Sequence, residues 1–190
     1  MGYFAPWVAR RPMTAGLAWN AYDLFDLLRL LPSIETGALT VNLHALRLPL
    51  IGLALMLPAL MAETGVWFRV AGGGLACGLA ATTLPPYPEI INAWHTPGWQ
   101  VPFWWGIGSM AVSLITIWLA PKMNRYLHWW LLAVAMIGSC PAAVTYARLR
   151  PALQELHAAH VGAGWGFWVY LINMSAIGLV VWYETLRSRL

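Results

Sequence analysis

Residues 103–120 read FWWGIGSMAVSLITIWLA, a stretch of eighteen positions without one charged side chain. The hydrocarbon core of a bilayer requires about 20 apolar residues in a helix, because each residue adds about 1.5 Å along the helix axis. This stretch therefore predicts a membrane-spanning helix. Four more apolar runs of similar length predict further spans, at residues 43–61, 66–84, 127–147 and 161–183. We expect an all-α integral membrane protein with a bundle of five transmembrane helices.

The composition of the whole chain supports the same interpretation. Of its 190 residues, 60% are hydrophobic and 9% are charged, whereas a soluble domain is about 45–50% apolar and about 25% charged. So little charge excludes a conventional soluble domain, a disordered tail and a module that binds nucleic acid. The chain is also rich in Trp, with 13 copies, and Trp gathers at membrane interfaces. The expected partners are the lipid bilayer and other membrane protein subunits, with no nucleic acid.

The N-terminal segment, residues 1–42, precedes the predicted bundle of residues 43–190. Within it, residues 14–31 place Leu at helical spacing on one side and charged or polar residues on another. Asp23, Asp26 and Arg29 make this stretch a poor membrane span. We predict instead an amphipathic helix that lies along the membrane interface.

The orientation in the membrane is left open by the distribution of basic residues. Five spans would place six Lys or Arg residues on the N-terminal side of the membrane and five on the other side. The connection at residues 85–102 carries no Lys or Arg, which favours an outside position for it. We expect a multi-pass protein of a bacterial inner membrane or a photosynthetic membrane.

Two pairs of glycines predict close contacts between helices. Gly74 and Gly78 are four residues apart in the second predicted span, as are Gly162 and Gly166 at the start of the fifth. Small residues at this spacing let two helix backbones approach each other. A bulky pigment or a lipid tail could use the same gap.

Four other residues inside the spans are most simply explained by packing and hydrogen bonding. Cys77 and Cys140 lie in apolar runs, which predicts two packing residues and no disulfide. Asn173 and Ser175 lie in the middle of the fifth predicted span. We expect them to form hydrogen bonds between helices.

Histidines are the first candidates for contacts to a cofactor, because a membrane helix can offer an imidazole to haem or to a chlorophyll-type pigment. The chain has five of them: His44, His95, His128, His157 and His160. His157 and His160 are three residues apart, but no third ligand accompanies them at close spacing, so no metal site is predicted. The alternative for each is an interfacial histidine bonded to water, a headgroup or the backbone.

Two charged residues complete the set of candidate contacts. Arg47 lies one turn from His44, where it could bind an anionic headgroup or a propionate, or extend to the membrane surface. Glu89 belongs to the stretch LPPYPEIINAWHTPGWQVPFWW, residues 84–105, which holds five prolines and one formal charge. This stretch could cover a quinone, a lipid or a tetrapyrrole, with Glu89 or His95 as the polar contact. As an alternative, it anchors the protein at the membrane interface.

The sequence favours a non-catalytic role. It contains no serine-nucleophile elbow, paired-cysteine motif, zinc-protease motif or phosphate-binding loop. No carboxylate lies at the midpoint of a predicted span, which argues against a proton-driven transporter. We therefore expect a non-catalytic subunit of a larger membrane complex for electron transfer or photosynthesis, in contact with a chlorophyll-type pigment, haem, quinone or bound lipid. The alternative is a small membrane protein that binds or acts on an apolar ligand.

Overall fold

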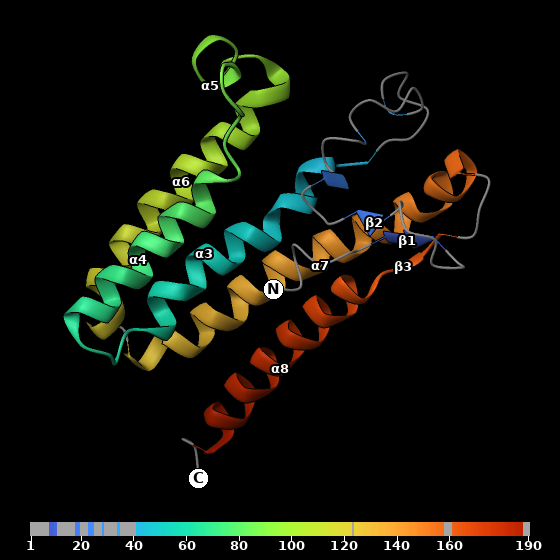
Figure 1. Cartoon of the computed structure of the whole chain (residues 1–190). Coiled ribbons are helices and arrows are strands. Elements are labelled where there is room, and N and C mark those ends of the chain that lie inside the picture. Colours follow the sequence, from blue (N-terminus) through green and yellow to red (C-terminus); the bar gives the residue numbers. More distant parts are fainter. Residues whose placement is uncertain are drawn as a thin grey trace. The chain divides into compact units, whose positions relative to one another are not determined.

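A computed structural model of the chain describes residues 8–10, 18–19, 23–24, 28, 34, 41–122, 124–157 and 161–187 (Figure 1). The described chain is mostly helical. Its helices are the 3-10 helix η1 (Leu43–Arg47), α3 (Leu48–Leu60), α4 (Val66–Ala81), α5 (Glu89–Asn92), α6 (Pro97–Leu119), the 3-10 helix η2 (Ala120–Lys122), α7 (Asn124–His157) and α8 (Trp165–Arg187). Three short strands accompany them: β1 (Val8–Arg10), β2 (Ala18–Trp19) and β3 (Val161–Ala163).

Four helical segments of the described chain are long and apolar enough to cross a membrane. They are Leu43–Leu60, Pro97–Lys122, Tyr126–Gln154 and Gly166–Tyr183. The other predicted span is also a helix, α4, but it has only 16 residues and is about 24 Å long. The predicted helical membrane protein is thus supported for four spans, whereas α4 is short for a hydrocarbon core of about 30 Å.

α4 ends at Ala81 rather than at the predicted Leu84, and threonine hydroxyls donate to carbonyl groups of its last turn. The hydroxyl of Thr82 donates to the carbonyl oxygen of Leu79, and that of Thr83 donates to the carbonyl oxygen of Ala80, each at 2.7 Å. Two prolines follow at residues 85–86 and cannot continue the helix, since proline lacks a backbone N–H.

α6 and α7 extend further than the apolar runs predicted. α6 begins at Pro97, six residues before the predicted start, because proline is well suited to the first position of a helix. α7 continues to His157, ten residues beyond the predicted end. Its extension keeps Leu149 and Leu153 buried on one side while Arg148 and Arg150 are exposed on another. An amphipathic continuation of this kind is not visible to a search for uninterrupted apolar runs.

The three strands form a small antiparallel sheet in the order β2-β1-β3, which no pattern in the sequence predicted. Ala18 pairs with Ala9, so the predicted interfacial helix of residues 14–31 is wrong at its beginning. Leu24 and Leu28 are helical and buried, and most of the remaining predicted helix lies outside the described residues. Gly162 lies in β3 and pairs with Ala9 of β1, whereas Gly166 lies in α8. The prediction that Gly162 and Gly166 lie on one helix is therefore also wrong.

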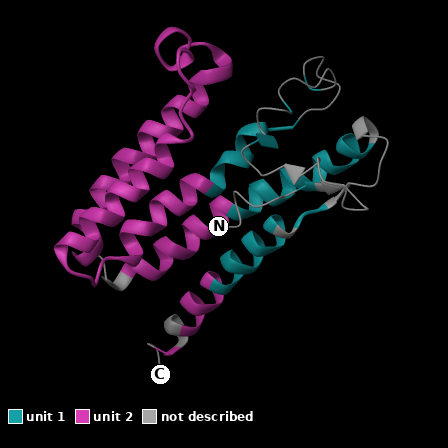
Figure 2. Ribbon diagram, viewed as in Figure 1, with its two compact units in different colours: residues 1–49, 139–176 teal, residues 50–138, 177–190 magenta. Residues whose placement is uncertain are grey.

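The chain divides into two compact units (Figure 2). One comprises Met1–Pro49 and Ser139–Ala176, and it holds the sheet and η1. The other comprises Leu50–Gly138 and Ile177–Leu190, and it holds α4, α5, α6, η2 and most of α3. The predicted division into residues 1–42 and 43–190 stays a prediction.

Helices of the second unit pack through small residues. α4 lies beside α6 (Figure 1), and a Cβ added to Gly73 would overlap the side chain of Ile117. At Gly52 of α3, an added Cβ would lie 3.4 Å from the Cα of Gly138 in α7. A cluster of small buried residues lies at the centre, consisting of Ala54, Ala76 and Ala80. Side chains of this size let helix backbones approach closely.

One hydrogen bond joins α6 to α3 at a point where α3 lacks an internal one. Pro58 lies inside α3 and has no N–H to donate to the carbonyl oxygen of Ala54, four residues earlier. The hydroxyl of Ser113 in α6, a fully buried residue, donates to that carbonyl oxygen at 3.1 Å. Ser113 therefore replaces the donor that the proline removes, which is how apolar helices tolerate proline in a membrane.

We predict that Ser113→Ala lowers the free energy of unfolding by about 1–3 kcal/mol, because it leaves a buried carbonyl group without a donor. In a Pro58→Ala background the same substitution is expected to have little effect, since an alanine in place of the proline would supply the missing N–H. Unfolding of the purified chain in detergent, followed by circular dichroism, measures both effects.

Ser109→Ala is the matched control. Ser109 is also buried in α6, but its hydroxyl donates at 2.9 Å to the carbonyl oxygen of Gly106 in its own helix. This carbonyl oxygen keeps the ordinary helical donor four residues later when the hydroxyl is removed. Equal losses for Ser113→Ala with and without Pro58 would contradict the prediction.

Candidate functional site

His44 and Arg47 lie together on η1, in the first unit. A 3-10 helix has three residues per turn, so positions three apart stand above one another. The side chain of Asn42 accepts a hydrogen bond from the backbone N–H of His44 at 3.1 Å and so begins the helix. Arg47 is only 3% exposed. This burial argues against an arginine that extends to the membrane surface.

The two histidines of the C-terminal region are described less fully. His157 is the last residue of α7, and its side chain lies outside the described part of the chain, as does all of His160. Among the residues whose placement is described, no group of three or more His, Cys, Asp or Glu side chains is arranged to hold a metal ion.

Glu89, His95 and His128 belong to the second unit. Glu89 begins the short helix α5 and is partly buried, whereas His95 is exposed. His128 lies in α7, partly buried. The chain between α4 and α6 thus carries two of the predicted contacts, and α7 carries the third.

An aromatic cluster fixes the connection between α5 and α6. The ring of Trp94 lies 4.9 Å from that of Phe103 and 6.4 Å from that of Trp104, measured between centroids. His95 meets the same indole edge-on at 5.8 Å. Trp94 therefore packs the connection against the first turns of α6.

The outer side of this connection is apolar and exposed. Tyr87 is 80% exposed, and Ile91 and Trp104 are exposed as well. Their exposure favours the interpretation of residues 84–105 as an interface anchor over that of a cover for a ligand.

A belt of exposed aromatic residues marks the opposite end of α4 and α6. α4 and α6 are antiparallel, since Gly73 in the middle of α4 faces Ile117 near the end of α6, and Gly106 faces Thr83 and Leu84 just after α4. The connections between α3 and α4 and between α6 and α7 therefore both lie at this end. Trp67 and Trp118 are 86% and 76% exposed. The other exposed members of this aromatic belt are Phe68, Tyr126 and Trp129.

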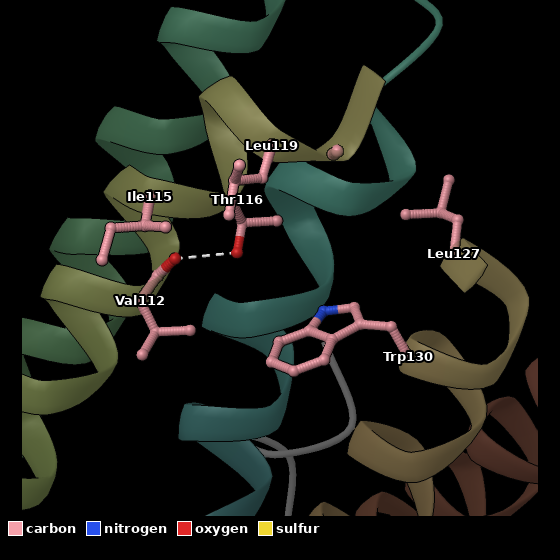
Figure 3. Close-up of a pocket in the computed structure, with 7 residues that line it drawn as sticks. Val112, Ile115, Thr116, Leu119, Leu127 and Trp130 are labelled. Atoms are coloured by element: carbon pink, nitrogen blue, oxygen red, sulfur yellow. Dashed lines mark hydrogen bonds between the residues drawn. The ribbon is translucent and has the colours of Figure 1, made fainter. Parts of the chain in front are cut away.

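A pocket of about 220 Å³ opens at this end, between α6 and α7 (Figure 3). Its lining is almost wholly apolar and includes Val112, Ile115, Thr116, Leu119, Leu127 and Trp130. Figure 3 shows the indole of Trp130 reaching from α7 into the space beside α6. None of these residues was a candidate from the sequence, because each is an ordinary member of a predicted span.

Two polar groups lie in the pocket. The hydroxyl of Thr116 donates to the carbonyl oxygen of Val112 in its own helix at 2.7 Å, so its hydrogen is already used. The indole Nε1 of Trp130 is buried, and it has no acceptor among the described residues. A tryptophan N–H can only donate. The pocket therefore offers an apolar volume with one available donor.

The predicted close packing at Gly74 and Gly78 is not formed within the described chain. Nothing lies within 4 Å of a Cβ added to either residue, whereas Gly72 and Gly73 face Met61 and Ile117 directly. The buried residues of α4 are Gly72, Gly73, Ala76 and Ala80, so its buried side differs from the predicted one. The open side leaves a strip of small residues, which we call the glycine face: Ala71, Gly74 and Gly78.

The remaining polar predictions have mixed outcomes. Asn173 is exposed and donates at 2.7 Å to the carbonyl oxygen of Val169 in its own helix, so the predicted bond between helices is wrong for this residue. Ser175 is exposed on the same helix. Cys77 is partly buried, whereas Cys140 is exposed, so the predicted packing role of Cys140 is not seen within the described chain.

We predict that His95→Ala leaves the fold and its stability unchanged, because the imidazole is exposed and its ring lies 5.8 Å from that of Trp94 in an edge-to-face arrangement. Trp94→Ala is the comparison and is expected to lower stability by about 1–3 kcal/mol, since it removes the contacts with Phe103 and Trp104. Thermal unfolding in detergent, followed by circular dichroism, distinguishes the two variants. A loss of folded protein in His95→Ala would assign this histidine a structural role.

The described residues thus offer three surfaces for function: the exposed side of residues 84–105, the glycine face of α4 and the pocket beside Trp130. Comparison with protein-family models, curated proteins and solved structures finds no match to this chain.

Proposed function

We propose that this chain is a non-catalytic, integral membrane subunit of a larger membrane complex. The observation that carries the proposal is the glycine face of α4. Ala71, Gly74 and Gly78 lie on one side of the helix at spacings of three and four residues, and all three are exposed.

The glycine face suits a second helix better than it suits lipid. Association of helices in a bilayer depends on van der Waals contact and close backbone approach, which small residues at this spacing permit. The buried side of α4 already uses the same device, because Gly73 accommodates Ile117 of α6. An apolar helix from another subunit could pack on the open side in the same way.

The large exposed side chains around the glycine face support this proposal. Val70 and Leu75 are exposed on α4 close to its glycines. A strip of small residues with larger side chains nearby on the same helix is suited to the ridge of side chains on another apolar helix. The wider apolar surface of α6, α7 and α8 is compatible with contacts to lipid.

We predict that Gly74→Leu and Gly78→Leu separate the chain from its complex and leave the isolated chain as stable as before. A leucine on this face meets nothing within the described chain, and leucine is a better helix former than glycine, so the substitution is not expected to lower stability. The measurement is the size of the assembly purified in mild detergent from the native membrane, together with unfolding of the isolated chain.

Two controls separate loss of assembly from loss of folding. Gly108→Leu makes the same change at an open position on α6, so the assembly is expected to persist. Gly73→Leu would overlap Ile117, so the isolated chain is expected to lose stability. The proposal fails if the unaltered chain leaves its native membrane as a monomer, or if Gly74→Leu and Gly108→Leu have the same effect on assembly.

A complex for electron transfer or photosynthesis is the more specific form of this proposal, in a bacterial inner membrane or a photosynthetic membrane. Candidate contacts to a chlorophyll-type pigment or haem are His44, His95 and His128. We predict absorption bands of a tetrapyrrole in the purified complex between the near ultraviolet and the near infrared. A spectrum with only aromatic absorption would contradict the electron-transfer or photosynthetic assignment and leave the subunit role in place.

The pocket beside Trp130 favours a second candidate function, a small membrane protein that binds an apolar ligand. Quinone, lipid and tetrapyrrole are the ligands expected from the sequence, with Glu89, His95 and Arg47 as polar contacts. The pocket lies on α6 and α7 and includes none of these three residues. A ligand in this pocket would therefore depend on Trp130 rather than on the residues predicted.

A further inference from the structure

We infer that the pocket between α6 and α7 binds an anionic phospholipid. One acyl chain occupies the apolar pocket, an ester carbonyl of the lipid accepts a hydrogen bond from Nε1 of Trp130, and Lys122 lies near the phosphate. This inference identifies the ligand of the second candidate function. It does not depend on the proposed subunit role, which concerns the glycine face of α4.

The size and lining of the pocket suit part of a flexible chain. Sites that enclose a drug-sized molecule have volumes of about 300–1,000 Å³, and this pocket has about 220 Å³. A tetrapyrrole ring is too large for it, whereas a segment of acyl chain fits and leaves the rest of the lipid outside. The side chains of Val112, Ile115 and Leu119 provide the apolar contacts on α6.

The indole N–H of Trp130 requires a hydrogen-bond acceptor at one position on the ligand. Its Nε1 atom is buried and has no acceptor among the described residues, although buried donors are usually satisfied. In Figure 3 the nitrogen edge of the indole faces the part of the pocket beside Thr116. A saturated hydrocarbon alone would leave this donor unsatisfied. A lipid ester supplies an oxygen directly next to an apolar chain.

The depth of Trp130 agrees with the position of ester groups in a bilayer. Trp130 is six residues from the start of α7 at Asn124, about 9 Å along the helix. The exposed aromatic belt of Trp67, Trp118 and Trp129 lies at the same end of the unit. Such belts lie at the headgroup level, where phospholipid ester groups are found. The acyl chain then extends along α6 toward the hydrocarbon.

Lys122 gives the site its charge. It lies in η2, two residues from Ala120, which lines the pocket, and its side chain is exposed. An exposed cation two residues along the chain from the pocket lining complements a negatively charged headgroup. An anionic phospholipid satisfies the cation, the indole N–H and the apolar lining together.

The test is native mass spectrometry of the full-length chain in detergent, titrated with phosphatidylglycerol or with phosphatidylcholine of identical acyl chains. We expect phosphatidylglycerol to bind about fivefold more tightly, and Lys122→Gln to remove that preference. Trp130→Phe keeps an aromatic ring but removes the N–H, so it is expected to weaken binding of both lipids about three- to tenfold.

Trp129→Phe is the matched control, because Trp129 is the exposed neighbour of Trp130 and lies outside the pocket; its binding should equal that of the unaltered chain. Val112→Trp fills the pocket and should weaken binding even if Trp130→Phe folds poorly.

Equal binding of the two lipids, or equal effects of Trp129→Phe and Trp130→Phe, overturns the inference. Displacement of phosphatidylglycerol by a quinone at lower concentration also overturns it and assigns the pocket to the quinone. The assembly measured with Gly74→Leu is unaffected by any of these results.

Discussion

The hydroxyl of Ser113 takes the place of a backbone donor that Pro58 cannot supply. Without it, the carbonyl group of Ala54 would be buried with neither a protein partner nor water. The bond therefore fixes α6 against α3 at one level, and the buried residues Ala76 and Ala80 of α4 pack at the same cluster as Ala54. Three helices of the second unit are held in register around this point. α6, one of these three helices, also provides the α6 side of the pocket and Trp118 of the aromatic belt.

Much of the helical organisation could be predicted from the sequence. A long apolar segment in a membrane must form a helix, because only its own backbone can supply hydrogen-bond partners for its N–H and C=O groups. The predicted runs at residues 43–61 and 103–120 both correspond to described helices. The boundaries were less predictable where another interaction decided them. Two prolines at residues 85–86 prevent α4 from continuing, and buried Leu149 and Leu153 accompany the extension of α7 past its apolar run. The sheet depends on pairing between residues far apart in the sequence, which a search for helical periodicity cannot detect.

The candidate site was less accessible to sequence analysis, and for a different reason. Residue types with distinctive chemistry, such as His95 and Glu89, attracted the predictions, yet His95 is exposed on the connection before α6. The pocket instead depends on how α6 and α7 approach each other, and its one available donor belongs to a single tryptophan among 13. The glycines predicted that α4 packs closely through small residues, but not which side of α4 does so. Gly72 and Gly73 face other side chains of the unit, whereas Gly74 and Gly78 face open space. Spacing reveals a shared face, and only packing reveals which face is covered.

The exposed tryptophans decide which optical signal can report unfolding. Trp67, Trp104, Trp118, Trp129, Trp168 and Trp182 all lie on the surface of the described chain. In detergent or lipid their indole emission depends mainly on the surrounding amphiphile, whether the helices are folded or not. These six tryptophans are therefore weak fluorescent probes of the folded state. The same emission is well suited to measuring depth in a bilayer, because quenchers attached at known positions along a lipid chain would reach these rings directly.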